Sequence, residues 1–175
     1  SKPVTIKVAI DYEKRKGARP FGGTFGFGNA VEISEPIDYN TMRVKESVEY
    51  NTESFHANLE HSLSLFTNAY SAVTYDNPFR EVDNTNSSAY AQSYAGGSSR
   101  GRTSLAPDNM AKHVTAGVAK ELSYWHSRVT ANAGFGWLRQ DATLLPATIN
   151  SAITGALELP RKTARASVDT RFYSV

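Results

Sequence analysis

Val4-Thr5-Ile6-Lys7-Val8-Ala9-Ile10-Asp11-Tyr12 is the stretch that decides the fold of this chain. Apolar residues occupy every second position from Val4 to Tyr12, and Lys7 and Asp11 lie between them. Successive side chains of a β-strand point to opposite faces, so this stretch predicts a strand with one apolar and one polar face.

Five further stretches alternate in the same way, and their links are alternately long and short. The predicted strands cover about residues 4–12, 41–50, 55–65, 113–122, 126–138 and 163–172. The links 51–54 and 123–125 are the size of hairpin turns, whereas 13–40, 66–112 and 139–162 read as long loops. Strands of about ten residues with short turns on one rim and long loops on the other are typical of a transmembrane β-barrel. We therefore predict an all-β, antiparallel, up-and-down wall with its long loops outside a bacterial outer membrane.

The polar faces of these strands carry many charges, which we predict to line a wet lumen. The candidates are Lys7, Asp11, Arg43, Lys45, Glu49, Glu60, Arg128, Arg165, Asp169 and Arg171. So many charges would be prohibitive in a dry sandwich core, although a soluble β-sandwich with this face toward solvent remains an alternative.

Two further features concern the apolar faces. Tyr12, Tyr50, Phe55, Trp137 and Phe172 lie near strand ends, where aromatic girdles are expected. Glu46 and His61 fall mid-strand on the supposed lipid face, so that either the strand that holds Glu46 has a bulge or that face meets protein.

Composition excludes several classes of protein. The 175 residues contain no run of 18 apolar residues, which excludes a transmembrane helix. They contain no cysteine, so this chain has no disulfide and cannot attach a c-type haem. The net charge of +2 gives no support to nucleic-acid binding.

No motif supports catalysis or a bound metal. The run Gly22-Gly23-Thr24-Phe25-Gly26-Phe27-Gly28 lacks the Lys-Ser/Thr of a phosphate loop, and the four histidines lack ligand spacing. Asp76-Asn77 and Asp108-Asn109 could supply oxygen ligands to a hard cation, but turn capping is the better interpretation. We therefore predict no catalytic, metal-binding or cofactor-binding residue.

One segment is more specific. Ser62-Leu63-Ser64-Leu65-Phe66-Thr67-Asn68 and the run on to Asp76-Asn77-Pro78-Phe79 resemble the hallmark of the decahaem-associated outer-membrane porins of the MtrB/PioB type, with Tyr75 where that family usually has Trp. Pro107-Asp108-Asn109, before the fourth strand, fits the same order. Family members are several times longer, so the resemblance implies that this chain is an arc of about six strands in a larger barrel. We then expect the first and sixth strands not to pair with each other.

The resemblance also implies a function. In that family the barrel sheathes a multihaem c-type cytochrome that carries electrons across the outer membrane, and the haem belongs to the partner. The partners implied are that cytochrome, outer-membrane lipid and the rest of the wall. A general porin or transporter, and a soluble β-sandwich binding module, remain the alternatives. We expect Asp76-Asn77-Pro78-Phe79 to form a structural corner, with Asp76 and Asn77 bonded to nearby backbone N–H groups and the Phe79 ring buried.

Overall fold

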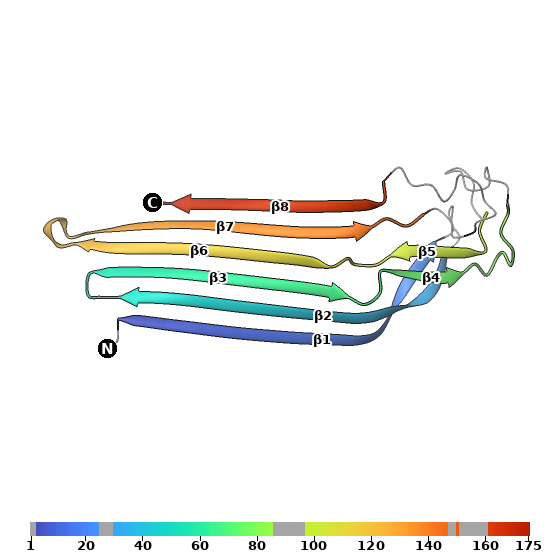
Figure 1. The fold of residues 1–175 in the computed structure, drawn as a ribbon, viewed down its shortest axis with the longest axis horizontal. Coiled ribbons are helices and arrows are strands. Elements are labelled where there is room, and N and C mark those ends of the chain that lie inside the picture. The colour runs from blue at the N-terminus through green and yellow to red at the C-terminus, as the bar shows by residue number, and fades with distance from the viewer. Residues whose placement is uncertain (1–2, 25–29, 86–96, 147–149, 151–160) are drawn as a thin grey trace.

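The computed structural model describes residues 3–24, 30–85, 97–146, 150 and 161–175. Its main feature is one antiparallel sheet with the strand order β1-β2-β3-β6-β7-β8, beside a small sheet of β4 and β5 (Figure 1). The strands are β1 (Val4–Thr24), β2 (Ala30–Asn51), β3 (Phe55–Asn68), β4 (Ala72–Asp76), β5 (Arg100–Ser104), β6 (Asn109–Leu122), β7 (Ser127–Thr143) and β8 (Thr163–Ser174). The predicted all-β antiparallel fold is confirmed.

The short and long connections lie at opposite ends of the sheet, as predicted (Figure 1). At the short-turn end, the Phe55 carbonyl accepts a 2.8 Å hydrogen bond from the Thr52 N–H. The second short turn is the 3-10 turn η2 (Ser123–Trp125), which ends at His126 in the left-handed conformation (φ 48°). The other three connections lie at the opposite end, which we call the long-link rim.

The main sheet is open. Among the described residues β1 pairs only with β2, and β8 pairs only with β7, so the outer edge of each strand is unpaired. The expectation that the first and sixth main strands do not pair is therefore confirmed.

The first long loop was predicted wrongly. Most of 13–40 is paired strand, because β1 continues to Thr24 and β2 begins at Ala30. Pro20 lies on the edge strand β1, and Pro36 lies beyond the last β2–β3 partners, Tyr39 and Asn68. Proline is tolerated at both positions because it cannot donate to a ladder and each position has an unpaired side.

The other two loops also contain strand. The segment 66–112 holds the β4–β5 hairpin, and β6 begins at Asn109 rather than at His113. The segment 139–162 loses its first residues to β7, which continues to Thr143. The residues at these strand ends are mostly polar or small, so they lack the alternation of apolar and polar residues on which the prediction depended.

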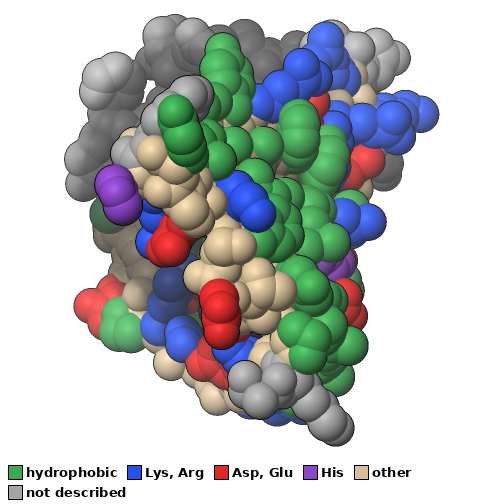
Figure 2. All heavy atoms as spheres, turned by 90° about the vertical axis from the view of Figure 1, so that its left-hand side faces the viewer, with side chains coloured by type: hydrophobic (Ala, Val, Ile, Leu, Met, Phe, Trp, Pro, Cys, Tyr) green, Lys and Arg blue, Asp and Glu red, His purple; other side chains and the backbone are tan. Residues whose placement is uncertain are grey.

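The ladder between each pair of neighbouring strands is continuous, so each residue has a fixed face. The apolar face carries, among others, Val4, Ile6, Val8 and Ile10 of β1, then Val44 and Val48 of β2, Leu59 and Leu63 of β3, Val114 and Val118 of β6, and Phe135 and Trp137 of β7. The polar face carries seven of the ten predicted lumen residues: Lys7, Asp11, Arg43, Lys45, Glu49, Glu60 and Arg128. Viewed from the short-turn end, hydrophobic side chains form a band along one side of the sheet (Figure 2).

The remaining three candidates, Arg165, Asp169 and Arg171, were placed on the wrong face. Asp169 lies opposite Trp137 and Arg171 opposite Phe135, so the polar side of β8 joins the apolar face. Figure 2 shows Lys and Arg side chains beside the hydrophobic band toward the β8 end of the sheet. Because the side-chain period is two, a one-residue change of register moves every side chain of a strand to the other face.

Two kinds of contact hold β8 in this register. Arg139 donates to Asp169 at 2.6 Å, and Arg165 donates to Asp141 at 2.9 Å, both across the β7–β8 ladder. On the opposite side the Phe172 ring covers Gly134, where an added Cβ would lie 2.0 Å from a ring carbon. Phe172 therefore belongs to the polar face and not to an aromatic girdle on the apolar face.

The Glu46 anomaly has a simple geometry. The β1–β2 and β2–β3 ladders contain no bulge, so Glu46 does lie on the apolar face. It is directly opposite His61, and the His61 Nδ1 lies 3.4 Å from a Glu46 carboxylate oxygen. The two polar groups that resisted the pattern are thus partners of each other.

We predict that Gly134→Ala destabilises the wall by about 1–3 kcal/mol, because an added methyl group would overlap the Phe172 ring. The fraction of folded, heat-modifiable barrel on a gel after partial urea unfolding measures this effect. Gly22→Ala is the matched control, since a Cβ at Gly22 has open space. Addition of Phe172→Ala should restore part of the loss; no change in Gly134→Ala would contradict this packing.

Candidate functional site: a polar wall and a folded rim

Three ion pairs join six of the seven predicted lumen residues on the polar face. Lys7 Nζ lies 2.9 Å from Glu49, Arg43 lies 3.0 Å from Asp11, and Lys45 lies 3.1 Å from Glu60. Each pair joins neighbouring strands and is largely exposed, so each contributes little to stability. Their larger effect is that β1, β2 and β3 present charges without an excess of either sign.

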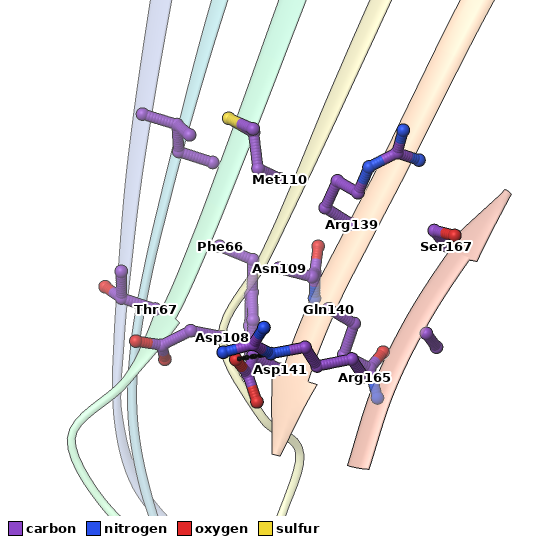
Figure 3. Close-up of a pocket in the computed structure, with 12 residues that line it drawn as sticks. Phe66, Thr67, Asp108, Asn109, Met110, Arg139, Gln140, Asp141, Arg165 and Ser167 are labelled. Atoms are coloured by element: carbon purple, nitrogen blue, oxygen red, sulfur yellow. Dashed lines mark hydrogen bonds and ion pairs between the residues drawn. The ribbon is translucent and has the colours of Figure 1, made fainter. Parts of the chain in front are cut away.

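Two shallow grooves lie on opposite faces of the sheet. The first, about 600 Å³, is on the apolar face at the long-link rim, between Met110, Arg139, Asp141, Arg165 and their neighbours (Figure 3). The Arg165–Asp141 ion pair crosses it. The second, about 470 Å³, is on the polar face between Arg43 and Lys45 on one side and Leu138 and Val168 on the other.

The rim itself is a folded structure rather than a set of open loops. The ends of β1 and β2 pass behind β4 and β5 (Figure 1). Tyr75 of β4 packs against Gly23 of β1 and Gly101 of β5. Its ring fills the space above Gly23 and Gly101, where an added Cβ would lie 2.5 Å and 2.4 Å from the ring, and its hydroxyl donates to the Thr24 carbonyl at 3.3 Å. Glycine at both positions permits this close approach.

A buried carboxylate also marks this rim. Glu35 of β2 is 1% exposed and accepts two hydrogen bonds from Arg19 of β1, at 2.8 Å and 3.0 Å. The Tyr39 hydroxyl adds a third, at 3.4 Å. The hydrogen bond to Glu35 raises the pKa of Arg19 above its usual value. A buried carboxylate needs such partners, because an unpaired one would strongly disfavour folding.

The Asp76-Asn77-Pro78-Phe79 segment forms a corner after β4. Asn77 is 5% exposed; its side-chain oxygen accepts the Phe79 N–H at 2.9 Å, and its amide donates to the Ser98 carbonyl at 2.9 Å. Asp76 instead pairs with Arg100 at 3.2 Å. The expectation that the Phe79 ring is buried is wrong, because this side chain is 65% exposed. Among the described residues, hydrogen bonds from Asn77 hold this corner.

The Pro107-Asp108-Asn109 segment brings the chain back to the main sheet. Asp108 accepts the Asn68 N–H at 2.8 Å, and the Asn68 amide donates to the Ala106 carbonyl at 2.9 Å. Asn109 then begins β6 opposite Phe66, and its side-chain amide donates to the Pro107 carbonyl at 3.5 Å. Local turn capping therefore describes Asn77, whereas Asp76 pairs with Arg100 and Asp108 joins the end of β3 to the start of β6.

Asp83 was not anticipated from the sequence. It accepts the Ser99 N–H at 2.6 Å and the Asn150 side-chain amide at 2.6 Å, so it ties three distant parts of the long links together. The Ser99 hydrogen bond lowers the pKa of Asp83 below its usual value. No periodic pattern could have singled it out, since its partners lie 16 and 67 residues away. Tyr75 and Glu35 were missed for the same reason.

Within the described ranges, no group of three or more His, Cys, Asp or Glu side chains could hold a metal ion. The same part of the chain has no helix that is long and apolar enough to cross a membrane.

Comparison with known families decides the class. Residues 1–175 match the family model described as an outer membrane beta-barrel porin, MtrB/PioB. The chain belongs to the MtrB/PioB family. Among curated proteins, none matches this chain. The family assigns this MtrB/PioB chain to the outer membrane, which confirms the predicted location and removes the soluble binding module as an alternative.

We predict that Asn77→Ala loosens the rim much more than Asp76→Ala does. The first substitution removes a buried side-chain amide and leaves the Phe79 N–H and the Ser98 carbonyl without their hydrogen bonds to it. We expect this loss to lower the free energy of unfolding by about 1–3 kcal/mol. The second removes an exposed ion pair worth at most about 1 kcal/mol. The rate of limited proteolysis near Ser98 in the folded protein compares the two; equal rates would contradict the corner described here.

We predict that the rim loses stability on acidification through Asp83. Its folded pKa is lowered, so its contribution is fully present above the unfolded pKa of about 4 and is lost as the pH falls toward the folded value. Hydrogen exchange of the Ser99 amide should therefore speed up, relative to the intrinsic rate, only as the pH falls below about 4. Asp83→Asn should remove this pH dependence; an unchanged profile in that variant would assign it to another group.

Proposed function

We propose that this chain forms part of a wide barrel wall that encloses a multihaem c-type cytochrome and insulates it within the outer membrane. The observation that carries the proposal is the contrast between the two faces of one open sheet. Across β1 to β7, one face is mainly apolar, although Lys112, Lys120 and the Glu46–His61 pair interrupt it. The other face carries paired charges, hydroxyls and glycines. This suits a wall with lipid outside and a large polar object inside.

The open edges support a wide barrel. The described strands make an arc in which β1 and β8 each offer an unpaired edge to further strands. Barrel diameter grows with strand number, and a folded cytochrome needs a lumen much wider than an eight-stranded barrel provides. Six strands are also fewer than the smallest bacterial barrels use.

The physical logic is insulation. Electrons pass only between closely spaced redox centres, so a chain of haems must span the membrane. A cytochrome with a polar surface cannot be exposed to hydrocarbon, because buried charges and polar groups are costly there. A neutral but hydrophilic inner face would receive such a protein. In this proposal the polar face, with Lys7, Asp11, Arg43, Lys45, Glu49, Glu60 and Arg128, is the lumen wall.

The rim would then form the outer mouth of this barrel. Bacterial barrels place short turns in the periplasm and long loops outside, which puts β4, β5 and the Asn77 corner at the extracellular end. Tyr75 reaches the polar-face side of Gly23, so the β4–β5 hairpin lies over the lumen side of the β1–β2 extension. We infer that this hairpin narrows the mouth where the enclosed protein ends or an extracellular cytochrome docks.

The chemistry in this proposal belongs to the partner. The chain has no cysteine with which to attach a c-type haem, and we assign it no catalytic residue and no cofactor. Its tasks are to hold, orient and insulate.

The test is purification of the protein from outer membranes in detergent. We expect the barrel to co-purify with a haem absorbance band, an intact mass that includes a cytochrome, and low ion conductance in a planar bilayer because the lumen is filled. A barrel that carries no haem protein and conducts ions freely would instead establish a general porin or transporter.

A further inference from the structure

The polar face contains a hollow that the paired charges do not explain. It has a volume of about 470 Å³ and extends across β2, β3, β6, β7 and β8. Its floor contains the small residues Ser62, Ser64, Ala111 and Gly136, and His113 of β6 lies between Ser62 and Gly136. We call this hollow the lumen groove.

The two sides of the lumen groove differ in chemistry. On the β2 side, Arg43 and Lys45 already have acidic partners in Asp11 and Glu60. That side therefore carries no unmatched cation for an anionic ligand. On the β8 side, Leu138 of β7 lies directly opposite Val168 of β8, and both are exposed, at 42% and 51%.

The apolar side continues toward the short-turn end. Phe172, 47% exposed, covers Gly134 and stacks on His113, with 6.2 Å between ring centroids and 18° between ring planes. Leu138, Val168 and Phe172 thus form an exposed apolar strip, interrupted by Thr170, on an otherwise hydrophilic face. This strip exists because the register of β8 turns its apolar side chains toward the polar face.

An exposed apolar strip of this kind is unfavourable in a lumen that holds only water. Covering it by protein would remove apolar surface from water, which is the main favourable contribution to association. The adjacent hydroxyls of Ser62, Ser64 and Thr170 can form hydrogen bonds with a polypeptide backbone. A neutral segment with an apolar side chain beside free peptide groups fits both parts of the lumen groove.

We propose that the lumen groove seats a neutral, partly apolar loop of the polypeptide enclosed in the barrel, and fixes the position of that polypeptide against the wall. The inference rests on the proposed function and adds the contact surface. The charge balance on the β2 side favours a neutral loop over an exposed haem propionate or another anion. The groove, rather than the paired charges on β1 and β2, then provides the specific contact.

The test fills the groove and measures retention of the partner. Ala111→Trp places a large ring over the floor on β6. Ala116→Trp is the matched control on the same strand, because Ala116 belongs to the apolar face, and Ala9→Trp controls for bulk on the polar face outside the groove. The readouts are the amount of heat-modifiable folded barrel and the haem content per folded barrel in the detergent-purified complex.

We expect Ala111→Trp to lower haem per folded barrel at least fivefold, while both controls keep it within twofold of the wild type. Val168→Ser, which removes one apolar group without adding bulk, should lower it about threefold, and it decides the question if Ala111→Trp fails to assemble. Raising the salt concentration to 1 M should release little haem, because the contact is neutral; release by salt alone would indicate an anionic contact and overturn the proposal.

The outcomes separate the two proposals. If the wild-type barrel retains its haem protein and both groove variants retain it equally well, the sheath function stands and the groove proposal is overturned. An equal loss in Ala9→Trp would show that the lumen is generally crowded, which also overturns a specific groove. A wild-type barrel without a haem protein would overturn both proposals.

Discussion

The antiparallel ladder is the constraint on which the rest of this structure depends. Each pair of neighbouring strands in the main sheet has an unbroken register, so one assigned residue fixes the face of every other residue in that sheet. The hydrophobic face, the ion pairs of the hydrophilic face and the position of each groove all follow from it. Contacts such as Arg139–Asp169 confirm a register that the backbone hydrogen bonds define.

The sequence was informative where apolar and polar residues alternate along the ladder, and uninformative where they do not. Val4 to Tyr12 alternates strictly and Phe55 to Leu65 alternates except at His61, and both fall within observed strands. Beyond Tyr12 the alternation fades into Lys, Arg, Gly and Pro, although pairing continues to Thr24. Those residues form no regular apolar face, so alternation cannot reveal the strand there.

The face of β8 could not be found from its own residues. The residues of β8 alternate clearly between apolar and polar. Its register with β7 decides which of the two alternating sets lies on the apolar face, and the sequence of β8 alone does not determine that register. Gly134 permits this arrangement, because its missing side chain leaves room for the Phe172 ring. Similarly, the Asn77 corner was predictable as a turn, whereas the exposure of Phe79 depends on what lies above it.

The clamp at Asn68 and Asp108 has a consequence for how such proteins diversify. The hydrogen bond between the Asn68 N–H and Asp108 joins the two ends of the segment that connects β3 and β6. Directly beside it, the β3–β6 ladder begins with Phe66 opposite Asn109. The length or sequence of the segment between Asn68 and Asp108 can therefore change without shifting any residue pair of the β3–β6 ladder. The entropic cost of closing a loop rises only with the logarithm of its length. Related proteins can therefore differ in this segment while the main sheet stays the same.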